Sequence, residues 1–504
     1  MLHKCKFIKQ SNICFSLIPS QEWVLNTHKL INELEGIVGK SSVIHHPDDL
    51  LVFAYDGLVD TGTPQAVVFP TSTEQVSKVL TLANSRNIPV TPRGAGTGLS
   101  GGAIAHAGGI ELSLTRMSSI LEIDPENRTA LVEPGVVNLD LSTAASAHGL
   151  YFAPDPSSQR ACTIGGNVAE NSGGPHCLKY GVTTNHVLAL EVVLEDGSVL
   201  WLGDAYRGRP GYDLVGALVG SEGMLGVFTK AIVSLLPSPE SVRTLLAVFS
   251  DIDLASNAVS KVIASGLIPT AMEMMDALTI RAVEKAMNFG YPKDAGAILL
   301  IEVDGLEVEV IDAMEQIIEM CYDSGAAAVK HASESKDREM LWAGRKGALG
   351  ALGALAPNYY LVDGVVPRSK LTDVLQKVSE IGEQYGLPIA NVLHAGDGNL
   401  HPLIVFDERQ KGKKEQAMEA GAKIVEICVN AGGTLTGEHG VGLEKKDFMP
   451  LVFNEEDISL MMKLKDTFAP TGLLNPGKMF PDGSSCADFR QINITGTAGL
   501  GSWI

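Results

Sequence analysis

The stretch PRGAGTGLSGGA, residues 92–103, decides how the first part of this chain folds. A G-x-G-x-x-G pattern begins at Gly96, but it indicates a classical nicotinamide site only when it opens a helix. The residues that follow, AIAHAGGIELSL, have no helical periodicity and return to an apolar strand at 110–114. We therefore expect an anion-binding loop, in which successive glycines let backbone N–H groups turn toward one phosphate-bearing ligand. The alternatives are a nicotinamide site and a surface loop without a ligand.

Regular elements are predicted on both sides of this loop. Residues 71–87 carry apolar side chains at helical spacing, with Ser72 and Gln75 placed as a capping box. A short strand at 88–90 should lead into the loop. Further on, HVLALEVVLEDGSVLWL predicts two strands joined by a two-residue turn at Asp196-Gly197.

A second region is predicted after the proline-flanked segment LLPSPE, from about Ser241. Strand, helix and strand follow one another twice, which favours an antiparallel sheet with helices on one face in a ferredoxin-like plan. The expected strands are 245–249, 270–274, 297–303 and 326–330, and the expected helices are 254–264 and 308–321. The chain is therefore expected to be an α+β protein in which this region caps the first.

Composition and charge limit the classes of function. The 504 residues are 45% hydrophobic, which is enough for two or three packed domains. The 39 basic and 59 acidic residues leave a net charge of -20, so nucleic acid is not an expected partner. The same charge repels anionic substrates at long range. An acid substrate must then be captured by local cations or by a metal.

The seven cysteines are scattered and form no C-x-x-C pair. This is typical of reduced thiols in a cytoplasmic protein and argues against an iron–sulfur cluster bound by this chain. The sequence has no apolar stretch of the ~20 residues that span a bilayer, and its start lacks a secretory cleavage pattern. We expect a soluble, cytoplasmic protein, with peripheral membrane association through partners as an option.

Two more glycine-rich loops, TIGGNVAENSGG (163–174) and GSEGMLGVFT (220–229), indicate a large, extended ligand. With these three loops, the chain resembles the FAD-linked oxidases of the vanillyl-alcohol oxidase and p-cresol methylhydroxylase type. Within that family it is similar to the catalytic FAD-binding chain of glycolate oxidase and to D-lactate and D-2-hydroxyglutarate dehydrogenases. The resemblance extends from about Asp56 to Met479.

The resemblance implies a two-part FAD-binding domain of the p-cresol methylhydroxylase type, a ferredoxin-like cap that holds the substrate, and a C-terminal helical segment that returns to the flavin. The domain boundaries expected from it are an N-terminal helical segment at 1–55, the FAD-binding domain at 56–240, the cap at 241–450, the returning segment at 451–481 and a flexible tail at 482–504.

By the same resemblance, FAD is bound by all three loops and by the segment LLNPGKMF near the C-terminus. Some relatives attach FAD covalently through a histidine in the glycine loop, where this chain has Ala95 and Thr97, so we expect non-covalent FAD. The implied FAD-binding residues are Arg93, Gly94, Ala95, Gly96, Thr97, Gly98, Leu99, Ser100, Pro154, Asp155, Thr163, Gly166, Asn167, Gly173, Glu222, Gly226, Val227, Asn475 and Lys478.

Histidines and a carboxylate cluster in two later motifs. NVLHAGDGNLHPLIV places His394 and His401 on either side of a Gly-Asp-Gly-Asn turn, and a hairpin would bring both imidazoles to the same rim. TLTGEHGVGLEKK offers Glu438 and His439 between glycines. Two histidines and one carboxylate can bind a divalent ion with open positions. The resemblance makes His394, His401 and Glu438 the ligands of Zn, Mn or Fe, and His439 the base. Hydrogen-bonded histidines without a metal are the alternative.

Oxidation of a 2-hydroxy acid requires a base for the hydroxyl proton while a hydride leaves the α-carbon for flavin N5. Arg345 matches a carboxylate-binding arginine of the hydroxyglutarate enzymes, with a solvated helix arginine as the alternative. Leu361 stands where those enzymes have a lysine for a second carboxylate, which favours a short monocarboxylic substrate.

The expected reaction is therefore the oxidation of glycolate to glyoxylate, with D-lactate dehydrogenation to pyruvate as the second option. Electrons would pass to a quinone-linked acceptor or to partners, namely a second flavin-domain subunit and an iron–sulfur subunit. A subunit kept for assembly or electron relay is a third interpretation, and intact His394, His401 and His439 argue against it.

Overall fold

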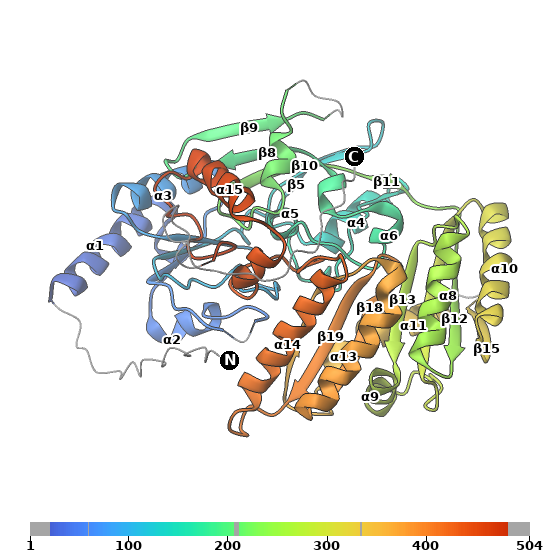
Figure 1. The fold of residues 1–504 in the computed structure, drawn as a ribbon. Helices are drawn as coiled ribbons and strands as arrows, with labels where there is room; N and C mark the ends of the chain where they lie inside the picture. The colour runs from blue at the N-terminus through green and yellow to red at the C-terminus, as the bar shows by residue number, and fades with distance from the viewer. Residues whose placement is uncertain (1–20, 59, 206–210, 333–334, 482–504) are drawn as a thin grey trace.

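The computed structural model describes residues 21–481 except 59, 206–210 and 333–334. Two parts lie side by side (Figure 1), and the segment after residue 450 crosses back to the first part. The predicted tail at 482–504 and the start of the predicted N-terminal segment lie outside the described residues. The predicted domain boundaries stay predictions.

A sheet of four short strands carries the glycine loop. Its strand order is β1-β2-β4-β3, and both β2 and β3 run parallel to β4. The chain leaves β3 at Arg93 and reaches β4 without an intervening helix, as predicted, but the predicted strand at 88–90 begins at Val90. The elements here are β1 (Val43–Ile44), β2 (Ala66–Val68), β3 (Val90–Arg93), β4 (Ile110–Ser113), α1 (Gln21–Val38), α2 (Pro47–Leu50) and α3 (Thr73–Ser85).

Helix α3 confirms the predicted helix and corrects its cap. The Ser72 hydroxyl accepts the N–H of Gln75 at 3.3 Å, which satisfies one of the free donors of the first turn. The Gln75 side chain does not return to Ser72. It accepts the N–H of Thr71 at 2.7 Å, one residue further out, so the reciprocal half of the predicted capping box is wrong.

A second sheet, antiparallel and with strand order β5-β6-β10-β8-β9, completes the first part. The predicted hairpin is β8–β9, but its turn is longer than expected. Leu194 N–H donates to Ser198 O at 2.8 Å, which leaves three residues in the loop, and Gly197 alone among them has a positive φ of 88°. That is the usual three-residue hairpin with glycine in its left-handed position.

The remaining elements of the first part are β5 (Ile120–Asp124), β6 (Thr129–Val132), β7 (Leu150–Tyr151), β8 (Val187–Val193), β9 (Val199–Gly203), β10 (Val227–Ser234), β11 (Leu236–Pro237), α4 (Asn138–Ser146), α5 (Ile164–Glu170), α6 (Cys177–Tyr180) and α7 (Leu214–Leu218).

One large antiparallel sheet forms the second part, with strand order β15-β12-β14-β13-β18-β19-β16 and β17 paired to β19. Its first four strands have the order of a ferredoxin-like unit, as predicted. Strands β18, β19 and β16 repeat that order in reverse. The two units therefore meet edge to edge at the antiparallel β13–β18 pair.

The elements of this part are β12 (Ser241–Phe249), α8 (Ile252–Ala264), β13 (Ala271–Asp276), α9 (Ala277–Met287), β14 (Ala297–Gly305), α10 (Glu307–Asp323), β15 (Ala328–Ala332), α11 (Ser335–Lys346), α12 (Ala348–Leu352), β16 (Asn358–Leu361), β17 (Gly364–Val365), α13 (Leu371–Tyr385), β18 (Ile389–His394), β19 (Asn399–Phe406) and α14 (Lys413–Asn430).

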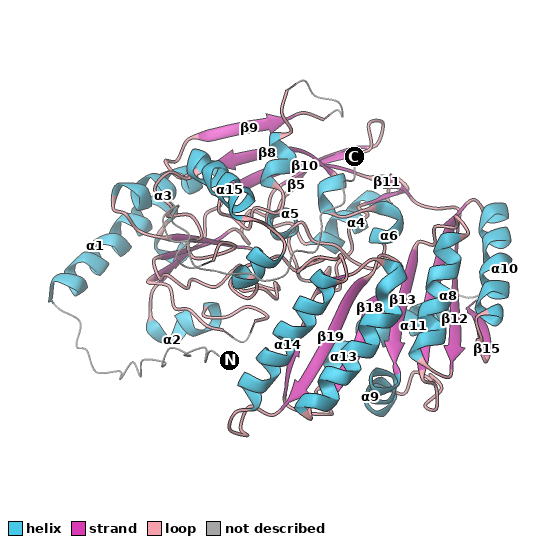
Figure 2. Cartoon of the chain, viewed as in Figure 1, coloured by secondary structure: helices cyan, strands magenta, loops and turns pink. Residues whose placement is uncertain are grey.

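Helices lie on both faces of this sheet, whereas the sequence predicted one. Helices α8, α10, α13 and α14 cover one face (Figure 2) and share its main apolar core. Helices α9 and α12 pack on the other face against a second core. The strands are consequently buried on both sides along much of their length, which explains their nearly continuous apolar runs.

The C-terminal segment returns to the glycine loop, as predicted. After α15 (Glu455–Phe468), Leu474 forms a parallel bridge to Val90 beside β3. Thr471 and Leu473 donate their N–H groups to the Glu195 carboxylate, which fixes the approach of the chain. In the described residues, no helix is both long and apolar enough to cross a membrane.

Candidate active site

The glycine loop is shaped by contacts that leave no room for side chains. Gly96 has a φ of +70°, and a Cβ there would lie 2.1 Å from Arg93 Nη2. A Cβ on Gly94 would lie 2.4 Å from Thr163 Oγ1, which accepts the Gly166 N–H and caps α5. Gly98 differs, because a Cβ would meet no protein atom within 4 Å. Gly94 and Gly96 are therefore packed against protein atoms, whereas Gly98 borders open space. The prediction of a loop over 163–174 is partly wrong, because Ile164–Glu170 forms helix α5.

Arg93 and Lys478 stabilise the backbone around the glycine loop. The Arg93 guanidinium is buried, donates to Tyr55 O at 2.9 Å and lies 3.4 Å from Glu111 Oε1. Lys478 Nζ donates to three loop carbonyls, those of Gly101, Gly102 and Ile104, at 2.7 to 2.9 Å. These two cations consequently brace the backbone.

Asn475 and Glu222 join the loops to one another. Asn475 Nδ2 donates to Gly102 O at 3.0 Å and to Glu222 O at 2.6 Å. The Glu222 carboxylate accepts the N–H groups of Val441 at 2.7 Å and Gly442 at 2.8 Å. The third glycine loop is thereby tied to the segment that carries His439.

A cavity of about 380 Å³ lies between the two parts of the chain. It is lined by most of the predicted FAD-binding residues together with His401, Glu438, His439 and Arg345. The lining FAD-binding residues are Arg93, Gly94, Ala95, Gly96, Thr97, Gly98, Leu99, Thr163, Gly166, Asn167, Gly173, Glu222, Gly226 and Val227. The cavity lining does not include Ser100, Pro154, Asp155, Asn475, Lys478 or the predicted ligand His394.

Strand register gathers the polar side chains on one face of the cap sheet. Glu273 on β13 pairs with His394 on β18, and Val392, two residues before His394, pairs with His401 on β19. Because side chains alternate along a strand, these residues share the face toward the first part. The predicted hairpin thus brings both imidazoles together, with ring centroids 5.1 Å apart.

Glu438 lies at the centre of three imidazoles. Its Oε1 is 3.3 Å from His394 Nε2, 3.4 Å from His401 Nε2 and 3.5 Å from His439 Nε2. The His401 and His439 rings stack at 4.9 Å. These contacts bring together all four residues that the sequence singled out.

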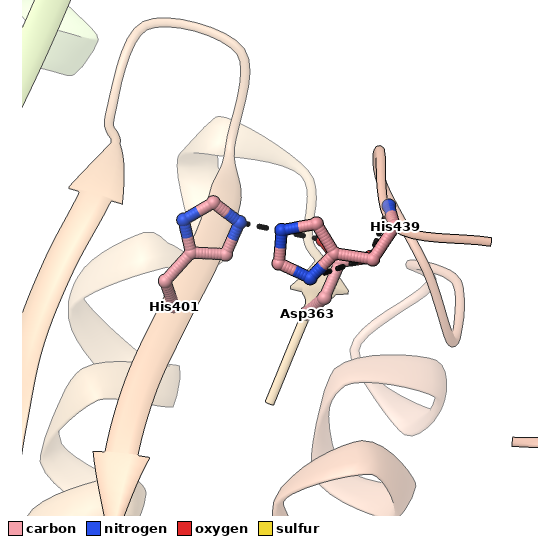
Figure 3. A group of neighbouring side chains, drawn as sticks. All are labelled: Asp363, His401 and His439. Atoms are coloured by element: carbon pink, nitrogen blue, oxygen red, sulfur yellow. Dashed lines mark hydrogen bonds and ion pairs between the residues drawn. The ribbon is translucent and has the colours of Figure 1, made fainter. Parts of the chain in front are cut away.

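Asp363, which sequence reasoning missed, organises the loop of Glu438 and His439. It is fully buried at the interruption between β16 and β17. Its Oδ2 accepts the Thr436 hydroxyl at 2.6 Å and the N–H groups of Gly437, Glu438 and His439 at 3.0, 3.3 and 3.0 Å. Figure 3 shows Asp363 with His401 and His439, which come from three separate segments.

Two ligand sets are available for a metal. The predicted His394, His401 and Glu438 place one donor atom each within 4.8 Å of the others, and so do Asp363, His401 and His439. Among the described residues, His401 Nε2, His439 Nδ1 and Asp363 Oδ1 have no hydrogen-bond partner of good geometry. Such unsatisfied buried donors and acceptors are rare and fit a ligand site.

Opposite charges decide the protonation of the cluster. Burial would raise the pKa of Glu438, but the charge and hydrogen bond of His394 hold it well below its ordinary value. Burial would lower the pKa of His439, but the Asp363 charge outweighs it and raises the pKa. Burial lowers the pKa of His401. With protein groups alone, His401 is therefore the imidazole that most readily stays neutral.

Arg345 reaches the cavity from α11 and is not a solvated helix arginine. It is 4% exposed, and its Nη2 lies 2.6 Å from Glu273 Oε2. Sequence reasoning also missed Glu273. Its main signal is an acid inside the largely apolar run AMEMMD, which indicates a buried acid but does not identify its partners.

Two family models match the chain: "FAD binding domain" over residues 64–203 and "FAD linked oxidases, C-terminal domain" over residues 238–479. The chain belongs to the FAD-linked oxidases. Within that family it is similar to the glycolate oxidase subunit GlcD of Escherichia coli K12, with 47% identity over 90% of this chain and 91% of that protein.

GlcD of Bacillus subtilis is 43% identical over 85% of this chain and 92% of that protein. The D-lactate dehydrogenase of Anaerostipes hadrus is 35% identical over 85% and 92%. Among solved structures, p-cresol methylhydroxylase superposes with a TM-score of 0.74 at 17% identity, covering 90% of this chain and 96% of that chain. The predicted family and fold are confirmed.

Proposed function

We propose that this chain uses FAD to oxidise a small 2-hydroxy acid, and that the substrate is glycolate, which becomes glyoxylate. The observation that carries the proposal is the single cavity in which the glycine loops meet His439 and Arg345. The relatives named glycolate oxidase subunit are 47% and 43% identical, whereas the first two named D-lactate dehydrogenase are 35% and 36% identical. This difference favours glycolate over D-lactate.

The loops fit FAD. Three glycine-rich segments line one cavity, and the open space at Gly98 lets a phosphate-bearing ligand approach the backbone. Bound FAD would supply the acceptor for the two electrons that leave the α-carbon. We propose that it is held without a covalent bond, because Ala95 and Thr97 offer no nucleophilic imidazole in the loop.

The donor set also fits a divalent cation. The buried carboxylate of Asp363 and the largely buried one of Glu438 face three imidazoles, and Lys445 supplies one ammonium beside Asp363. The cluster therefore carries excess negative charge whenever the imidazoles are neutral. We propose His394, His401 and Glu438 as the ligands of a Zn, Mn or Fe ion. Such an ion would orient the hydroxy acid and lower the pKa of its hydroxyl.

The chain's own residues divide the remaining work. His439, held beside Asp363, is placed to remove the hydroxyl proton when its imidazole is neutral, as base catalysis requires. A bound cation would offset the carboxylate charge that raises the pKa of His439. The Arg345 guanidinium faces the same cavity and can bind the substrate carboxylate. This local cation would offset the repulsion between the anionic substrate and a protein whose net charge is -20. Leu361 lines the wall without offering a charge for a second carboxylate.

Electron transfer to a partner completes the proposal. GlcD is named a subunit of glycolate oxidase. We propose that this chain works with a second flavin-domain subunit and an iron–sulfur subunit, or with a quinone-linked acceptor, and can reach a membrane through them. The described cysteines Cys162, Cys177, Cys321 and Cys428 are unpaired, which supports the proposed cytoplasmic location.

The test is product formation with an artificial electron acceptor. Wild-type protein should convert glycolate to glyoxylate with a higher kcat/KM than D-lactate to pyruvate. His439→Asn should keep its FAD and lose about 10²- to 10⁴-fold in kcat. His148→Asn, an exposed histidine after α4, is the matched control and should keep full activity. Full activity of His439→Asn would contradict the assigned base, and a preference for D-lactate would establish the second option.

A further inference from the structure

Glu273 contacts two functional side chains at once. Its Oε1 lies 2.7 Å from His394 Nδ1, and its Oε2 lies 2.6 Å from Arg345 Nη2. The three side chains are at most 5% exposed. One carboxylate on β13 therefore joins a histidine of β18 to an arginine of α11.

We propose that Glu273 is a positioning residue that fixes His394 as a metal ligand and Arg345 as the carboxylate clamp of the same site. This inference rests on the proposed function, since it assigns Glu273 to the metal and to the substrate carboxylate. Glu273 itself touches neither reacting group, because it does not line the cavity.

The histidine half of the proposal, that Glu273 fixes His394 as a metal ligand, follows from hydrogen-bond geometry. In the neutral imidazole that a metal ligand must be, an Nδ1–H that donates to Glu273 would leave the His394 lone pair on Nε2, the atom that faces Glu438. A carboxylate behind a metal-binding histidine fixes the tautomer and the ring orientation and makes the imidazole a better ligand. Loss of such a partner typically weakens metal binding about 10- to 100-fold.

The arginine half of the proposal, that Glu273 fixes Arg345 as the carboxylate clamp, follows from the way α11 is fixed to the sheet. Arg345 is held by Glu273 on β13, and Trp342 Nε1 donates at 2.6 Å to Glu302 Oε2 on the neighbouring strand β14. The buried carboxylates of Glu273 and Glu302 thus anchor α11 at two positions that are three residues apart. Planar recognition of a carboxylate depends on a fixed guanidinium, so the Glu273 anchor should set how Arg345 meets the substrate.

Glu302 offers the matched control. It is a buried acid on the adjacent strand and anchors the same helix, but its side-chain hydrogen bonds go to Trp342, Thr244 and His176 rather than to His394 or Arg345. If Glu273 served stability alone, Glu273→Gln and Glu302→Gln would behave alike. Their difference therefore reports the assigned role.

The experiment compares FAD-loaded wild type, Glu273→Gln, Glu273→Asp and Glu302→Gln. Metal content is measured after dialysis, and Mn²⁺ and Zn²⁺ affinities are measured by competition with a chelator. Glu273→Gln should bind both ions about 10- to 100-fold more weakly and should have a raised KM for glycolate. Glu273→Asp keeps the charge and should recover part of the metal affinity. Glu302→Gln should lower Tm and keep the metal.

Arg345→Met separates the two halves. It should raise KM for glycolate and keep wild-type metal affinity, because Glu273 remains behind His394. Wild-type metal affinity and KM in Glu273→Gln would overturn the proposal, and so would equal metal loss in Glu302→Gln.

The results that would refute the proposed function differ from those that would refute the role of Glu273. A wild type that oxidises no 2-hydroxy acid refutes that function, while its metal affinities still decide the histidine half. A wild type that oxidises glycolate but binds neither ion overturns the metal and with it the histidine half.

Discussion

The backbone N–H of His439 donates to Asp363 Oδ2 at 3.0 Å, so the proposed base is positioned by an acid 76 residues away in the sequence. The same oxygen accepts the N–H groups of the two preceding residues. An acid that gathers three consecutive amides fixes the loop that presents both Glu438 and His439.

Asp363→Ala should therefore lower kcat for glycolate about 10- to 100-fold while FAD stays bound, because the loop loses its acceptor. Steady-state kinetics and the visible flavin spectrum measure the two effects. Asp276→Ala is the control, since Asp276 is an acid at the end of β13 in the same sheet whose carboxylate caps α9 and accepts from Asn391 rather than from a histidine. Equal kcat losses in both variants would show that Asp363 supports the sheet rather than the base.

Gly98→Ala should weaken FAD binding without lowering the Tm of the FAD-free protein. A Cβ at Gly98 meets no protein atom within 4 Å and needs no strained φ, so its cost should arise from the bound cofactor alone. Gly36→Ala in α1 has the same open surroundings away from the cavity and should keep wild-type affinity. The measurement is titration with FAD by fluorescence quenching. An unchanged FAD affinity in Gly98→Ala would move the ligand away from this part of the loop.

Leu361→Lys should shift substrate preference toward 2-hydroxyglutarate. Leu361 lines the cavity on β16, opposite Leu403 of β19, and a lysine there would supply the cation for a second carboxylate. A charged hydrogen bond contributes about 1.5–3 kcal/mol, so the ratio of kcat/KM values should change by roughly tenfold or more. Leu361→Met keeps the size without the charge and should leave the ratio near wild type. An equal shift in Leu361→Met would make pocket shape the cause.

His176 should make the contact between the two parts sensitive to high pH. It lies between Asp155 of the first part at 2.8 Å and Glu302 of the cap at 3.2 Å. Burial would lower the pKa of His176, but these two charges outweigh it and raise the pKa from 6.5 to about 10. The protonated imidazole therefore stabilises the fold fully below pH 6.5, and this contribution is lost as the pH rises toward about 10.

The Tm difference between wild type and His176→Gln should accordingly be large at pH 6.5 and shrink by pH 9.5. Thermal unfolding at both pH values measures it, and the subtraction removes groups that titrate in both proteins. A difference that stays constant across the range would mean that His176 contributes by packing alone.

The sequence predicted the parts of the site that lie close together along the chain. The glycine loop could be recognised by its density of glycines, and the absence of a helix after it argued against a nicotinamide site. The His394–His401 hairpin could be recognised because a Gly-Asp-Gly-Asn turn separates two apolar runs. Glu438 and His439 were identified as neighbours between glycines. In each case the signal was local, and the structure brings these residues together.

The missed residues depend on long-range pairing. Glu273 meets His394 only through the β13–β18 register, which joins strands more than 100 residues apart. Asp363 lies where β16 breaks before β17, and the Asp363-Gly364 step marks that break without indicating that the carboxylate reaches the loop of residues 437–439. The second ferredoxin-like unit was missed for the same reason. Its helices α13 and α14 lie on the face already covered by α8 and α10, so only the strand order reveals the repeat.

The central claim is that this cavity holds FAD where glycolate can reduce it, and anaerobic reduction tests it most directly. Glycolate is added to the purified FAD-loaded protein without oxygen, with D-lactate in parallel, while the oxidised flavin band near ~450 nm is followed. Faster bleaching by glycolate, with glyoxylate formed in equal amount, is the predicted result. A chain that binds no FAD, or a bound flavin that neither acid bleaches, would contradict the account.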